Sequence, residues 1–306
     1  MLTDNKKRSF SEDIMNPLEL STTVFPQLVE PGTIIGKVKS DAAEALGIQS
    51  GIAVIASGHD TQFAILGSGA GVNQPVLSSG TWEILMVRAQ SGSLQMPSRN
   101  SGVTIELDSQ PGLVNIGVQW VASGVLEWVS RLFYPDLSGS SRYTAMIEEA
   151  GSIPAGSSGV TMIPELFPGG FSGKPGGING FTHETTRSHI YRAALEAISY
   201  YTRYGLERLQ KVGNYQAKDV IIVGGGSRNP LWNQIRADVL GIPVKALDMK
   251  ETTALGAATT AFIGIGVYKN IREAFEAVES TYEEYQPGIE TNKYQELYSE
   301  FVEKVF

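Results

Sequence analysis

A strand, a glycine-rich loop, a helix and a second strand follow one another between residues 219 and 247, and no other stretch constrains the fold as much. Residues 219–223 predict a buried strand, because they form an almost unbroken apolar run. Three glycines follow, after which residues 231–240 predict a helix and residues 244–247 another strand. Because strands and helices alternate, the sequence predicts α/β or α+β layers.

Other elements follow from the spacing of apolar side chains. Residues 187–212 have apolar positions at helical spacing and predict the clearest helix of the chain. Residues 251–265 predict a helix crowded with Ala and Gly, which allows close packing against a neighbour. The remaining expectations are strands at 52–56, 75–78 and 82–87, a helix at 61–66, a strand and then a helix within 114–132, a long ordered loop or set of turns at 152–180, and final helices at about 270–285 and 289–305.

Composition and charge narrow the class of protein. The 306 residues suggest about two domains at ~150 residues each. A net charge of −8 without a block of Lys or Arg argues against nucleic-acid binding. The absence of cysteine excludes disulfides and thiol chemistry. The longest mostly apolar run, residues 254–268, is too short to cross a membrane, and the first residues lack a signal peptide, so we expect a cytoplasmic protein.

The first candidate for chemistry is Gly-His-Asp-Thr at residues 58–61, directly after the strand expected at 52–56. Ligands of α/β folds bind beyond strand ends, and Asp60 could there accept a proton from a substrate hydroxyl. Taken alone, however, the tetrapeptide more often means that Asp60 caps the helix that follows and that His59 is structural.

The second candidate is the Ser-Gly-Thr turn at residues 79–81, between two predicted strands. The backbone N–H groups of such a turn and the hydroxyl of Thr81 can face phosphate oxygens. An ordinary hairpin turn is the simpler alternative. The neighbouring Trp82 is expected in the core, because tryptophan is highly buried on average.

The third candidate is the loop Gly-Gly-Gly-Ser-Arg-Asn-Pro at residues 224–230. Its glycines let a ligand approach the backbone closely, although a plain strand-to-helix turn fits equally well. Asn229 stands where the dinucleotide fingerprint needs its third glycine, and no Gly-Lys-Ser/Thr follows as in a Walker A loop. A further stretch, residues 251–258, is on composition only a closely packed helix start.

Each motif is weak alone, but their order fits a nucleotide site built from two loops beside a general base. In this order the chain resembles the FGGY family of carbohydrate kinases. Residues 58–61 resemble the family's catalytic-aspartate motif, 79–81 its phosphate loop, 224–229 its adenosine loop and 251–258 its Glu-x-x-Ala-Leu-Gly-Ala-Ala stretch. A C-terminal family signature runs from Gly176 to Glu196, with Phe181 where the family usually has a smaller aliphatic residue.

The resemblance implies an α/β fold of the actin-like ATPase (ribonuclease H-like) class and a phosphotransferase that uses ATP and Mg²⁺. Asp60 would be the catalytic base, with His59 and Thr61 against the sugar. The implied contacts to ATP are Gly80, Thr81, Ser123, Gly225, Gly226 and Asn229. The metal ligands are unknown, since one magnesium-binding carboxylate of the family would lie on the part of the first domain that is missing here.

Two stretches, residues 58–64 and 77–88, are most similar to the branch of the family that phosphorylates L-fuculose to L-fuculose 1-phosphate in deoxysugar catabolism. The rhamnulose-phosphorylating branch shares His-Asp-Thr. The alternatives are therefore another FGGY sugar kinase, or a truncated, non-catalytic module that binds a nucleotide or a sugar. A dinucleotide-binding oxidoreductase domain is a third interpretation.

The resemblance also predicts the domain organisation. Family members open with an Asp-x-Gly-Thr phosphate loop, which does not occur near this N-terminus. We therefore expect residues 1–70 to be the end piece of a partial first FGGY domain, and residues 71–306 to be the second, nucleotide-binding domain with terminal helices. The expected partners are a small sugar and ATP, with a second copy or a separate N-terminal domain left open.

Overall fold

The computed structural model describes residues 2–98, 101–166, 171–249, 251–278 and 281–306, and within these its centre is a seven-stranded mixed sheet. The strand order is β13-β12-β11-β5-β6-β8-β7. β11 runs parallel to both of its neighbours, β5 and β12, and the other pairs are antiparallel. The strands are β5 (Val76–Ser79), β6 (Trp82–Gln90), β7 (Thr104–Leu107), β8 (Leu113–Val121), β11 (Val220–Val223), β12 (Val244–Leu247) and β13 (Tyr282–Tyr285).

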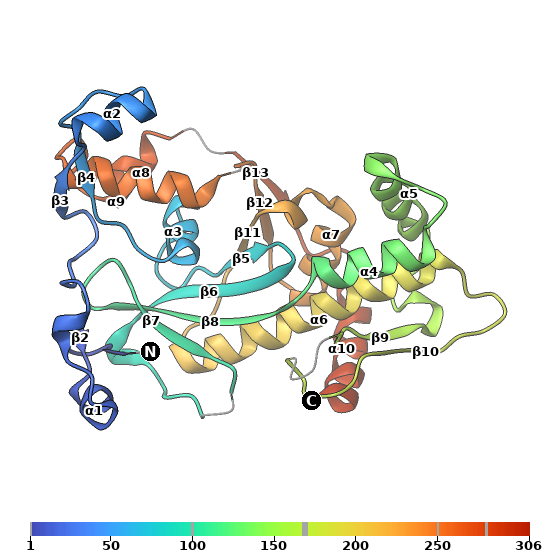
Figure 1. Cartoon of the computed structure of the whole chain (residues 1–306). Helices are drawn as coiled ribbons and strands as arrows, with labels where there is room; N and C mark the ends of the chain where they lie inside the picture. Colours follow the sequence, from blue (N-terminus) through green and yellow to red (C-terminus); the bar gives the residue numbers. More distant parts are fainter. Residues whose placement is uncertain (1, 99–100, 167–170, 250, 279–280) are drawn as a thin grey trace.

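Helices cover both faces of this sheet (Figure 1). α6, α4 and α7 pack on one face, and α3 and α8 lie over the other. The helices are α1 (Glu12–Met15), α2 (Ser40–Leu46), α3 (Asp60–Gly67), α4 (Ser123–Phe133), α5 (Gly139–Gly151), α6 (Arg187–Gly213), α7 (Pro230–Leu240), α8 (Thr252–Gly264), α9 (Ile271–Glu276) and α10 (Thr291–Val305), with short 3₁₀ turns η1 (Asn16–Leu18), η2 (Thr22–Val24), η3 (Ser91–Ser93), η4 (Ser157–Gly159) and η5 (Gly225–Arg228).

The two faces follow from the alternation of side chains along the strands. Leu77 and Ile222 belong to the large core on the α6 side, whereas Val76, Met86 and Ile221 belong to a second cluster that includes Ile65 of α3. Successive side chains of a strand point to opposite faces, so short apolar strands serve both cores. The result is a three-layer α/β fold.

The predicted helix at 187–212 is confirmed as α6, which begins and ends within one residue of the expected limits. Its start is fixed by a reciprocal cap, in which the Thr186 side chain accepts from the N–H of His189 and the Thr186 N–H donates to His189 Nδ1 (3.2 Å). Such a cap satisfies two backbone donors that a helix N-terminus leaves free.

The small residues of α8 bring it into direct contact with α3, as the composition predicted. A Cβ atom on Gly256 would lie 2.0 Å from the carbonyl oxygen of Phe63, which no real side chain tolerates. The two helix backbones therefore touch at this point, and α3 is held firmly against α8.

The expected helix at 270–285 is wrong in its second half. Among the described residues of this range only α9 is helical, and Tyr282–Tyr285 form β13, paired antiparallel with β12. Without β13, the outer backbone groups of β12 would be unpaired, and this pairing outweighs the helical spacing of the segment. The final helix is found as α10.

The stretch 152–180, expected as a loop or set of turns, also contains a small hairpin. Strands β9 (Thr161–Ile163) and β10 (Gly177–Asn179) pair antiparallel and lie beside α6. The intervening residues 167–170 of that expectation lie outside the described residues.

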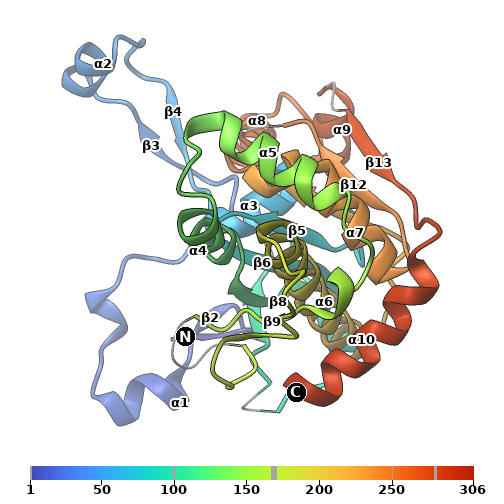
Figure 2. The ribbon, with the colours of Figure 1, turned by 90° about the vertical axis from the view of Figure 1, so that its right-hand side faces the viewer.

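Residues 2–56 form small elements at one side of the molecule. They are two hairpins, β1 (Thr3–Asp4) with β2 (Ser9–Phe10) and β3 (Ile34–Lys37) with β4 (Ala53–Ile55), together with α1 and α2. Figure 2 shows the β3–β4 hairpin and α2 standing out from the body. In the described part of the chain, no helix is long and apolar enough to span a membrane.

Candidate active site

The Gly80–Thr81 turn joins β5 to β6, and backbone hydrogen bonds tie it to the start of α4. The Gly80 carbonyl accepts from the N–H of Ser123 (3.1 Å), and the Thr81 carbonyl accepts from those of Ala122 (3.0 Å) and Gly124 (3.2 Å). The structure therefore brings Gly80, Thr81 and Ser123 together. The Gly80 N–H donates to the Trp82 carbonyl (3.0 Å). The turn itself is exposed, so the Thr81 hydroxyl can face a ligand.

Thr81 and Ser123 share a cleft with Gly124 and three further residues of α4, which are Glu127, Trp128 and Arg131. Ser123 is the first residue of α4, where the helix dipole favours an anion. Trp82, expected in the core, is instead 48% exposed at the first position of β6. That expectation was wrong because the strand begins at the open edge of the turn rather than inside the core.

The glycine loop follows β11 and rests on the end of β5. A Cβ atom on Gly226 would lie 2.0 Å from Ser79 Oγ, and one on Gly224, whose φ is +91°, would lie 2.7 Å from the Ser79 carbonyl oxygen. Asn233 of α7 anchors the loop by donating to the Ser227 carbonyl (2.7 Å). Glycine at these positions is required by packing against β5, and the loop thereby lies next to the Gly80–Thr81 turn.

Asn229 is the N-cap of α7. Its Oδ1 accepts from the N–H of Trp232 (3.1 Å), and its Nδ2 donates to the hydroxyl of Tyr191 (3.1 Å). Burial raises the pKa of Tyr191 above its ordinary value, while the hydrogen bond from Asn229 opposes the rise, so the phenol stays protonated at neutral pH. One Nδ2 hydrogen of Asn229 is left for a ligand.

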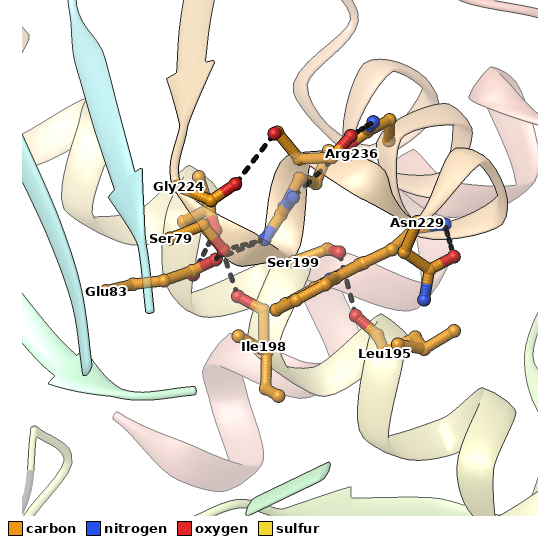
Figure 3. A network of polar contacts seen from close by, with 12 residues as sticks. Ser79, Glu83, Leu195, Ile198, Ser199, Gly224, Asn229 and Arg236 are labelled. Atoms are coloured by element: carbon orange, nitrogen blue, oxygen red, sulfur yellow. Dashed lines mark hydrogen bonds and ion pairs between the residues drawn. The ribbon is translucent and has the colours of Figure 1, made fainter. Parts of the chain in front are cut away.

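A buried polar network holds the turn and the glycine loop together. Figure 3 shows Ser79, Glu83 and Arg236 pointing toward one another below Gly224. Arg236 Nη2 donates to Ser79 Oγ (3.0 Å) and forms an ion pair with Glu83, and Ser79 Oγ also donates to Glu83 (2.8 Å). Glu83 and Arg236 are both fully buried. Burial lowers the pKa of Arg236, and the attraction of Glu83 opposes the shift.

Sequence reasoning missed Glu83 and Arg236. The one local signal is Glu83 itself, a carboxylate near the start of an otherwise apolar strand. Arg236 has no signal, since it is an ordinary charged residue of a helix.

The Gly-His-Asp-Thr motif lies at the start of α3. His59, not Asp60, is the N-cap, and Asp60 is the first helical residue. The Asp60 carboxylate accepts from the N–H of Thr61 (2.7 Å) and its hydroxyl (3.3 Å), and it lies 3.2 Å from His59 Nε2. The simple alternative, a conventional cap by Asp60, is therefore wrong. The Asp60 side chain is 77% exposed and open to a ligand.

The candidate residues form two groups. One contains Gly80, Thr81 and Ser123 with the glycine loop, and the other contains His59, Asp60 and Thr61. Between the two groups, no hydrogen bond or ion pair is found among the described residues. In the same described ranges, no group of three or more His, Asp and Glu side chains could hold a metal ion.

Comparisons with known proteins identify relatives of this chain. The model of the FGGY family of carbohydrate kinases, C-terminal domain, matches residues 76–265, and the model of its N-terminal domain matches residues 1–67. The L-fuculokinase of Escherichia coli (strain K12) is 45% identical over 99% of this chain and 61% of its own length, and that of Salmonella typhi is 45% identical over 94% and 60%.

Solved structures show the same fold. The xylulose kinase from Rhodospirillum rubrum superimposes with a TM-score of 0.84 at 24% identity, over 98% of this chain and 61% of that chain. The Plasmodium falciparum glycerol kinase with ADP gives 0.84 at 18% identity, over 100% and 61%. The expected α/β fold of the actin-like ATPase class is thereby confirmed.

The comparisons also bear on the domain expectation. A partial first domain is not borne out, because the models of both FGGY domains match the chain. The chain spans about three fifths of the length of the L-fuculokinases it matches.

Proposed function

Since this chain belongs to the FGGY family of carbohydrate kinases, we propose that it transfers the γ-phosphoryl group of ATP to L-fuculose, giving L-fuculose 1-phosphate and ADP. The L-fuculokinases at 42–45% identity support L-fuculose over other sugars. The family membership also argues against the dinucleotide-binding alternative. A cytoplasmic location and a role in deoxysugar catabolism belong to the same proposal.

The observation that carries the proposal is the joining of the turn, the start of α4 and the glycine loop into one rigid unit. Phosphoryl transfer depends on positioning and on stabilising charge at the phosphate oxygens. Thr81 and Ser123 would face the phosphates, and Gly225, Gly226 and Asn229 would hold the adenosine. Mg²⁺ would enter with the ATP phosphates, and no step depends on a metal ligand from the described residues.

Asp60 would supply the general base. Its carboxylate would accept the proton of the sugar hydroxyl as that oxygen forms its bond to the γ-phosphorus, while the bond to the ADP oxygen breaks. Exposure keeps the carboxylate accessible to a sugar. His59 and Thr61 would contact the sugar on either side. The division of the chain into residues 1–70 and 71–306 is part of the proposal, supported by family matches that end at 67 and begin at 76.

The test replaces Asp60 with Asn and measures ADP formation with L-fuculose, L-rhamnulose and D-xylulose. Loss of a general base lowers rates by ~10²–10⁴-fold, so we expect kcat with L-fuculose to fall in that range while the KM for ATP is unchanged. Asp41→Asn is a matched control, because Asp41 also accepts from the next N–H at a helix start (2.9 Å). It should keep full activity.

Near-normal turnover by Asp60→Asn would refute the base. Binding of ATP without any product from the unaltered chain would instead favour the alternative, a non-catalytic binding module. A preference for L-rhamnulose would move the substrate assignment to that branch.

A further inference from the structure

We propose that Glu106 is a positioning residue that fixes the tautomer of His59, so that His59 Nε2 accepts a hydrogen bond from a sugar hydroxyl beside Asp60. The proposal deepens the proposed function and rests on it for the identity of the sugar. Glu106 belongs to β7, the edge strand, and no motif singled it out.

The geometry forms a short chain of polar groups. His59 Nδ1 lies 3.3 Å from Glu106 Oε2, and His59 Nε2 lies 3.2 Å from Asp60 Oδ1. Gln62 Nε2, one turn along α3, donates to the same Oε2 of Glu106 (2.8 Å). The imidazole therefore stands between two carboxylates, one of which is held in place by an amide.

A neutral imidazole has one N–H, so the two carboxylates compete for it. Asp60 Oδ1 already accepts two hydrogen bonds, from the N–H and the hydroxyl of Thr61, whereas Glu106 Oε2 accepts one, from Gln62. The side chain of Asp60 is 77% exposed and that of Glu106 34% exposed, so water screens the attraction of Glu106 less. Both differences favour the tautomer in which Nδ1 carries the proton and donates to Glu106.

This tautomer has a consequence for the ligand. Nε2 then presents a lone pair beside the Asp60 carboxylate, and two acceptors lie next to each other at the start of α3. Two vicinal hydroxyls, each donating one hydrogen, match such a pair. The hydrogen-bond partner of one imidazole nitrogen commonly determines whether the other nitrogen donates or accepts a hydrogen bond. Glu106 would thus contribute to the recognition of a polyhydroxylated substrate without touching it.

The test is ¹⁵N NMR of the imidazoles in the full chain at alkaline pH, where imidazoles are neutral. The chain has three histidines, and the other two are internal references. His189 Nδ1 accepts from the Thr186 N–H, so that ring should carry its proton on Nε2. The side chain of His183 is 93% exposed and should show the free mixture of tautomers. We expect His59 to show the opposite tautomer to His189.

Variants separate positioning from structure. Glu106→Ala should move the His59 signals toward those of His183, and Glu106→Gln, which keeps the shape and an acceptor oxygen, should retain more of the Nδ1–H form. Thr104→Ala, on the same strand, should leave His59 unchanged. Addition of L-fuculose should shift the Nε2 resonance of His59 in the unaltered chain and not in Glu106→Ala.

Three results would overturn the proposal. They are a His59 spectrum like that of His183 or His189 in the unaltered chain, a doubly protonated ring, and signals that Glu106→Ala does not move. If the tautomer is as expected but L-fuculose shifts no His59 resonance, the acceptor role is wrong. A separate measurement tests the proposed function: an absence of ADP formation by the unaltered chain would show that this function is wrong.

Discussion

Gly225 and Gly226 are neighbours in the same loop but have different surroundings. A methyl group on Gly226 would collide with Ser79 Oγ, whereas one on Gly225 would meet no described heavy atom within 4 Å. We predict that Gly226→Ala lowers the melting temperature and weakens binding of MgATP, because the loop must move off β5. Gly225→Ala should keep the melting temperature and weaken only MgATP binding, because the methyl occupies the path of the nucleotide.

Thermal unfolding and calorimetric titration with MgATP distinguish the two variants. Gly92→Ala is the control, since its added methyl also meets no described atom and it lies outside the proposed site. Full binding by Gly225→Ala would place the adenosine elsewhere. An unchanged melting temperature of Gly226→Ala would contradict the close packing on Ser79.

At this scale the sequence predicted some residues of the site and not others. Asp60, Thr81 and the glycines are predicted because each stands in a local motif beside a strand end. Glu83 and Arg236 are 153 positions apart, and Glu106 and His59 meet only through the pairing of β7 with β8. The roles of these residues depend on burial and on contacts between distant segments, and a local sequence pattern predicts neither of these.

A buried ion pair joins elements of the fold in addition to the apolar packing. Glu83 of β6 is the partner of Arg236 of α7, and Trp120 of β8 also donates to it (2.9 Å). Removal of one partner of a buried pair leaves an uncompensated charge and costs about 3–5 kcal/mol. We predict that Glu83→Gln lowers the free energy of unfolding by roughly this amount, measured by denaturant titration.

The control for this change is Glu284→Gln, an exposed position on β13, which should be nearly neutral. The double variant Glu83→Leu with Arg236→Met removes both charges and should be more stable than Glu83→Gln alone. If the double variant is less stable than Glu83→Gln, the stability lost in Glu83→Gln comes from lost packing rather than from the unpaired guanidinium of Arg236.

Secondary structure was predictable where the local sequence alone determines it. Two segments with a clear pattern of apolar residues are found as predicted, the long helix at 187–212 and the strand at 244–247. The segment at 282–285 was misjudged because its state depends on the free edge of β12, which is known only once the sheet is assembled.

At the scale of the whole molecule, residues 2–56 expose more of their large hydrophobic side chains than the rest of the described chain does. Among the described residues, 12 of the 23 exposed large hydrophobic side chains lie between Ile14 and Val54. Thermolysin cuts before such residues where the backbone can unfold locally. We therefore predict that its first cuts fall within residues 14–54 and leave a stable product that still contains α3, identified by mass spectrometry.

The product should keep α3 because Gly256 of α8 touches the backbone of Phe63, so a cut within α3 would require the two helices to separate. The turn, the start of α4 and the glycine loop all lie in this product, and it should therefore bind MgATP as the full chain does, measured by calorimetric titration. A recombinant chain of residues 57–306 is the direct control and should unfold cooperatively. Early cuts after residue 60, or loss of MgATP binding on trimming, would show instead that the first 56 residues are needed to hold the nucleotide-binding unit in its folded form.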